Sequence, residues 1–128
     1  MNIAIAAVAG VGLYLAARKG TNMRIAVLDV EGVPQGALAA RHPYALHLAI
    51  DGLQEAVEIY TYALNESEQE TEWFAPRQDI LQPGEMFMRE FTAPNEPTSG
   101  HLYAEVYQVG AEDRLGYVIS AYEVQNEG

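Results

Sequence analysis

LYAEVYQV at residues 102–109 and YVISAYEV at residues 117–124 are the two stretches that decide the fold. In both, residues of contrasting polarity alternate with a period of two, which is typical of a β-strand with one buried face. Residues 110–116 join them, with a glycine at each end and charged residues between. The two stretches therefore predict an antiparallel hairpin.

Similar alternation occurs earlier in the chain, at residues 24–30, 44–50, 55–64 and 85–92. Segments containing glycine or proline lie between these stretches, as expected for strands joined by turns. About six or seven short strands at regular spacing predict a mainly β chain whose domain is an antiparallel β-sandwich. We prefer an immunoglobulin-like sandwich because the chain is short for a jelly roll, which is the alternative. Residues 37–41 suit a single turn of helix.

Residues 44–50 illustrate how the alternation assigns faces. Tyr44, Leu46 and Leu48 fall on one side of the predicted strand, and His47 falls on the other. Because successive side chains of a strand point to opposite faces, we expect the first set to face the core.

The N-terminal segment differs from the rest of the chain. Residues 1–17 contain no charged residue, and Arg18 and Lys19 follow directly. We predict an apolar helix over residues 1–20, followed by a β-sandwich domain over residues 21–128. The uncharged part of this helix, residues 1–17, would rise roughly 25 Å, slightly less than the bilayer core of about 30 Å. The residues that would anchor it in a membrane or a large assembly are Ile3, Ile5, Val8, Val11, Leu13, Leu15, Arg18 and Lys19.

Two other interpretations of this segment stay open. The helix could be buried among protein, in its own domain or in an assembly. Alternatively, Gly10-Val11-Gly12 could form a phosphate-binding turn between two strands, with Asp29 or Glu31 contacting a ribose. Only residues 13–19 would then be left for the crossover helix, and no further strand–helix–strand unit follows.

Charge is distributed unevenly along the 128 residues. Residues 1–24 carry a net charge of +3, whereas the remainder holds four arginines and all 18 acidic residues, for a net charge of −14. An acidic domain repels a phosphate backbone, so we expect no nucleic-acid binding through the β domain. Disulfides and thiolate metal sites are excluded because the chain has no cysteine.

We expect no catalytic residue, metal site or cofactor. His42, His47 and His101 do not have the spacing of zinc ligands. The acidic run at residues 66–72 lacks the aspartate and glycine pattern of a calcium loop. No serine lies in the G-x-S-x-G context of a nucleophile elbow. The chain is therefore predicted not to be an enzyme.

Tyrosine is the enrichment that indicates a surface. Tyr60 and Tyr62 share one face of a predicted strand, and Tyr103 and Tyr107 share a face of another. Such side chains bury area while keeping a polar tip, so they favour an interaction surface. The alternative is an ordinary half-buried sheet face. Trp73 is expected either as a further anchor of this surface or as a core residue.

These observations lead to one preferred function and two alternatives. We expect a structural or interaction protein anchored by its N-terminal helix in a membrane or a large assembly such as a virion. Its β-sandwich would contact other protein subunits. The alternatives are a solitary module that binds a small ligand or sugar on its tyrosine face, and a nucleotide-binding enzyme built on the Gly10 turn.

Overall fold

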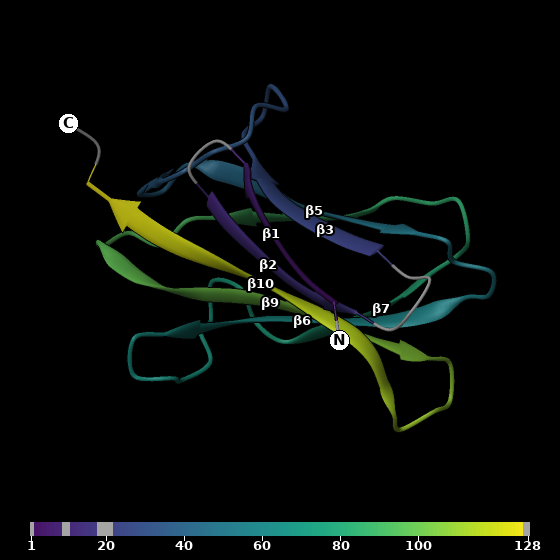
Figure 1. Ribbon diagram of the computed structural model, residues 1–128. Coiled ribbons are helices and arrows are strands. Elements are labelled where there is room, and N and C mark those ends of the chain that lie inside the picture. Colours follow the sequence, from purple (N-terminus) through teal and green to yellow (C-terminus); the bar gives the residue numbers. More distant parts are fainter. Residues whose placement is uncertain (1, 9–10, 18–21, 127–128) are drawn as a thin grey trace.

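The computed structural model describes residues 2–8, 11–17 and 22–126, with side chains from Met23 onward. Within these residues the chain forms ten strands in two sheets (Figure 1). The strands are β1 (Asn2–Val8), β2 (Val11–Ala17), β3 (Asn22–Leu28), β4 (Leu38–Ala39), β5 (Pro43–Asp51), β6 (Val57–Asn65), β7 (Arg77–Leu81), β8 (Phe87–Thr92), β9 (Thr98–Gln108) and β10 (Arg114–Gln125).

The larger sheet has the order β1-β2-β10-β9-β6-β7, and the smaller sheet has the order β3-β5-β8. Figure 1 shows β9 and β10 as the long central strands of the larger sheet. One edge of β10 serves two partners, because residues 116–120 pair with β2 and Val124 and Gln125 pair with β4. The β4 pairing is parallel, so the larger sheet is mixed. The mainly β, two-sheet prediction is confirmed, with this one departure from a purely antiparallel arrangement.

Alternation along the strands builds the core. In β5, Tyr44, Leu46 and Leu48 are buried and His47 lies on the opposite face, as predicted. The same pattern repeats in strands of both sheets, and together they form one hydrophobic cluster. Its largest fully buried members are Phe74, Met23, Ile25, Leu46, Leu48, Ile59 and Leu102.

The predicted N-terminal helix is not confirmed. Residues 2–8 and 11–17 form the strands β1 and β2, which pair with each other, and β2 also pairs with β10. β-Branched residues such as Ile3 and Ile5 favour strands, and β10 supplies the backbone partners that β2 needs. Of the predicted anchor residues, six lie in these two strands, and Arg18 and Lys19 lie outside the described residues. No helix of the described residues is long and apolar enough to cross a membrane.

The strands bear on two further local expectations. Val11 and Gly12 begin β2, whereas a phosphate-binding turn opens onto a helix, and Gly10 lies outside the described residues. The turn of helix expected at residues 37–41 is wrong, because Leu38 and Ala39 form β4. Leu38 is buried beside the end of β10, so tertiary pairing decides its conformation.

Candidate binding face

The outer face of the larger sheet gathers tyrosines from three neighbouring strands. Tyr62 of β6 lies opposite Tyr103 of β9, and Tyr60 lies opposite Glu105, which in turn lies opposite Tyr117 of β10. These tyrosines alternate with buried residues of the core, so their side chains point outward. We call Tyr60, Tyr62, Tyr103, Tyr107 and Tyr117 the tyrosine face. The two tyrosine pairs predicted on separate strands thus belong to one surface.

The rings of this face contact one another across the strands. Tyr62 and Tyr103 are stacked, with ring centroids 4.8 Å apart and an interplanar angle of 6°. Tyr60 lies 5.5 Å from Tyr62 in a tilted arrangement, and His101 lies 6.4 Å from Tyr103. A continuous row of four rings therefore runs diagonally over β6 and β9.

Glu105 holds the centre of the face in place. Its Oε2 accepts a hydrogen bond of 2.6 Å from the Tyr62 hydroxyl, and its Oε1 accepts one of 2.7 Å from the Tyr107 hydroxyl. Arg114 Nη1 lies 3.3 Å from Oε1. The Glu105 side chain is 14% exposed, so these contacts are largely shielded from water. Both carboxylate oxygens are occupied, which favours a positioning role for this residue.

The network shifts the pKa values of its members. Burial opposes ionisation of Glu105, but the hydrogen bonds from Tyr62 and Tyr107 and the charge of Arg114 outweigh it, so the pKa of Glu105 lies below its ordinary value. Burial and then the bond to Glu105 raise the pKa of Tyr62. The bond to Glu105 is the largest cause that raises the pKa of Tyr107. At neutral pH the network therefore consists of one carboxylate, neutral hydroxyls and one guanidinium.

Arg114 also contacts the tyrosine face as a cation. Its Cζ lies 4.3 Å from the centroid of the Tyr117 ring, which is within the range of a cation–π contact. A single guanidinium therefore meets a ring face and a carboxylate of this surface at the same time.

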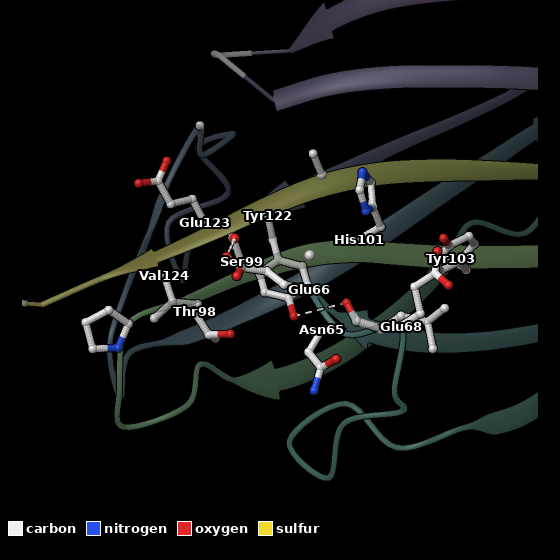
Figure 2. A pocket seen from close by; sticks show the side chains of 15 residues that line it. Asn65, Glu66, Glu68, Thr98, Ser99, His101, Tyr103, Tyr122, Glu123 and Val124 are labelled. Carbon is white, nitrogen blue, oxygen red and sulfur yellow. Dashed lines mark hydrogen bonds between the residues drawn. The ribbon is translucent and has the colours of Figure 1, made fainter.

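A hollow lies at each end of the tyrosine face. The larger one, an open groove of about 850 Å³, is shown in Figure 2, where Glu66 of the loop after β6 meets Ser99 of β9 in a hydrogen bond. His101, Tyr103, Glu68 and Glu123 also line it. The smaller hollow, of about 300 Å³, is lined by Glu58, Tyr60, Gln78, Tyr107 and Ala111. Carboxylates are thus present in both.

Gly100 permits the close strand contact beneath the larger groove. A Cβ at this position would collide with the backbone oxygen of Leu64 and would lie 2.7 Å from the Tyr122 hydroxyl. Because glycine has no Cβ, that hydroxyl donates a 3.2 Å hydrogen bond to the Leu64 oxygen. The tyrosine of β10 therefore reaches across β9 to the backbone of β6.

Trp73 belongs to the interior cluster and not to the tyrosine face. Its ring lies 5.0 Å from Tyr122 in an edge-to-face contact and 5.8 Å from Phe91, and the side chain packs partly buried against the core. Its position therefore matches the expectation of a core residue and not that of a surface anchor.

Sequence reasoning missed a buried cation, Arg89 of β8. Its Nη1 donates to Thr61 Oγ1 at 2.9 Å and its Nη2 donates to the Ala75 oxygen at 2.6 Å, while its Cζ lies 3.9 Å from the Phe74 centroid. Burial and the charge of Arg77 lower the pKa of Arg89. The alternation of β8 was the available signal, since it places Arg89 on the inner face.

The described residues contain no group of three or more potential ligands that could hold a metal ion. Comparisons with protein-family models, with curated proteins and with solved structures find no match.

Proposed function

We propose that this chain is a non-enzymatic interaction protein that binds a protein partner through its tyrosine face. The observation that carries the proposal is the set of five tyrosines on one sheet face, one exposed and four partly buried, of which two are hydrogen-bonded to Glu105. Tyrosine supplies a large contact area at low conformational cost, and it is enriched in protein interfaces. Prior fixing of the rings reduces the entropy that a partner would have to overcome.

We also propose that residues 1–19 attach the chain to a large assembly, such as a virion, or to a membrane. β1 occupies one edge of the larger sheet, and its sequence contains no charge and no proline. An edge of this kind lacks the features that discourage pairing with a strand from another subunit. The opposite edge, β7, includes Arg77 and Asp79 and follows Pro76, and so is protected.

An unbiased peptide library displayed against the full chain tests the main proposal. Selected peptides are titrated into isotope-labelled protein, and chemical-shift changes are mapped by NMR. The expected result is that changes concentrate at Tyr60, Tyr62 and Tyr103. Binding confined to the smaller sheet would refute the proposal. If no peptide binds but a glycan array gives ligands on these tyrosines, the alternative of a sugar-binding module replaces it.

A further inference from the structure

We propose that the tyrosine face recognises a basic, extended polypeptide segment whose arginine or lysine side chains stack on its rings and pair with carboxylates at its two ends. This inference rests on the proposed function and adds the chemistry of the partner. Three observations support it: the order of residues across the sheet, the contacts that the Arg114 side chain makes on the same surface, and the negative charge of the domain.

The order of residues places acidic groups on both sides of the tyrosines. At one end, Glu58 lies opposite Tyr107 and lines the smaller hollow with Tyr60. At the other end, Ser99 lies opposite Glu123 and binds Glu66, beside the larger groove. A side chain that enters either hollow therefore meets a tyrosine ring and a carboxylate together.

Arg114 forms a pairing of this kind, with a tyrosine ring and a carboxylate, within the chain itself. Its guanidinium lies over the Tyr117 ring and next to Glu105, at 4.3 Å from the centroid and 3.3 Å from Oε1. The ring of Tyr60, which is 36% exposed, lines the smaller hollow with Glu58 and has no described cation over it. The smaller hollow therefore repeats the ring and the carboxylate of the Arg114 site without the guanidinium.

Charge complementarity selects a cationic partner. Residues 25–128 carry a net charge of −14, and Arg114 is neutralised by Glu105 on this face. A field of this sign attracts basic segments and increases their rate of association. Neutral sugars would stack on the rings but would gain nothing from the carboxylates' charge.

The spacing of the two ends sets the length of the segment. Glu58 and Glu66 are eight residues apart in the chain, which corresponds to roughly 27 Å at about 3.4 Å per strand residue. An extended segment of about nine residues would span this distance, with every second side chain facing the sheet. Alternate basic residues therefore give the best fit.

Calorimetric titration of the full chain with three synthetic peptides of about nine residues tests the inference. One alternates arginine with threonine, one alternates glutamate with threonine, and one alternates serine with threonine. We expect only the arginine peptide to bind, with NMR shifts at Tyr60, Tyr62 and Tyr103, and with affinity that falls as salt screens the charges.

Matched variants separate recognition by this face from general attraction to an acidic protein. The face variant combines Glu58→Gln, Glu66→Gln and Glu123→Gln. The control variant removes the same charge elsewhere, by Glu31→Gln, Glu55→Gln and Glu90→Gln, all at exposed positions. We expect the face variant to raise Kd for the arginine peptide about tenfold and the control variant to raise it less than about twofold. Circular dichroism verifies that both variants fold.

The outcomes distinguish this inference from the proposed function beneath it. Equal weakening by both variants, or equal binding of all three peptides, overturns the inference. If library peptides bind the tyrosine face without enrichment in basic residues, the inference fails and the proposed function stands. If no peptide of any composition binds there, both fail.

Discussion

Replacing Glu105 with glutamine tests whether this carboxylate organises the tyrosine face. The substitution keeps the shape of the side chain but removes its charge and turns one acceptor oxygen into an NH2 donor. Two hydroxyl donors, from Tyr62 and Tyr107, and the Arg114 guanidinium converge on the carboxylate. In the variant, the hydroxyl that faces the amide oxygen keeps its acceptor, whereas the other hydroxyl faces an NH2 group, which accepts no hydrogen bond.

The expected cost follows from these contacts. A hydrogen bond to a charged group contributes about 1.5–3 kcal/mol, and the glutamine oxygen retains part of this total. We therefore expect Glu105→Gln to lower the free energy of unfolding by about 2 kcal/mol at neutral pH. For a domain of this size the change corresponds to a decrease in Tm of roughly 8 °C.

The dependence on pH provides the sharper test. The folded-state pKa of Glu105 lies below its unfolded value, so its contribution is present above the unfolded pKa of about 4.3 and is lost as the pH falls through the folded pKa. Urea unfolding at several pH values should show the difference between wild type and variant shrinking below about pH 4. Glu90→Gln, at an exposed position on β8, is the control and should remain within about 0.5 kcal/mol of wild type. A difference that is equally large at low pH would refute the assigned role.

Three other substitutions test separate parts of the fold by urea unfolding. Gly100→Ala should lower the free energy of unfolding by about 2–3 kcal/mol, because the new methyl group would collide with fixed backbone. The control Gly32→Ala, with φ of 82° and nothing within 4 Å, should lower it by only about 1 kcal/mol. Similar decreases in the two variants would contradict the steric explanation. Arg89→Ala should lower the free energy of unfolding by about 3 kcal/mol, because it leaves a cavity and removes the donors to Thr61 and to the Ala75 oxygen. A decrease below about 1 kcal/mol would show that these contacts contribute little. Because the pKa of Tyr62 is raised in the folded state, its contribution to stability is complete below the unfolded pKa of about 10 and is lost as the pH rises further. In Tyr62→Phe, the free energy of unfolding should therefore fall less steeply at alkaline pH than in wild type. The same dependence on pH in both proteins would contradict this role of Tyr62.

Local alternation predicted much of the β domain correctly. The hairpin expected from residues 102–109 and 117–124 is present as β9 and β10, and the buried face of β5 is the one that alternation assigned. These successes share one cause, because a strand with one buried face records its orientation in its own sequence. Nothing beyond a few neighbouring residues was needed.

The expectations that the structure does not confirm lie where the deciding partner is far away in the chain. β2 pairs with residues 116–120 of β10, about a hundred residues downstream, and no pattern within residues 1–20 indicates that partner. An apolar, alanine-rich run is compatible with helix and strand alike, so the absence of charge does not distinguish the two. The two-residue strand β4 was missed for the same reason, since Leu38 and Ala39 are ordered by Val124 and Gln125.

The tyrosines of the candidate site were predictable from the sequence, but the central Glu105 and the assembly of the face were not. Alternation placed Tyr60 with Tyr62 and Tyr103 with Tyr107, yet only the register of β6 against β9 brings the two pairs together. The role of Glu105 depends on the same register, because Tyr62 belongs to one strand and Tyr107 to the other. A shift of one residue would have turned one set of side chains into the core.

Organisation of the face before binding connects its stability to its proposed function. Immobilising a flexible interface side chain costs about 0.5–1.5 kcal/mol, and the rings of Tyr62 and Tyr107 are already fixed by their bonds to Glu105. Loss of that carboxylate would transfer the ordering cost to the binding step, so Glu105→Gln should weaken an arginine peptide by more than the removal of one distant charge does. Because both Glu105 oxygens are occupied within the chain, this weakening would reflect looser rings and the unpaired charge of Arg114, and not loss of a direct contact with the partner. The comparison with Glu90→Gln removes the effect of net charge, which is the same in the two variants, and leaves these local effects of Glu105.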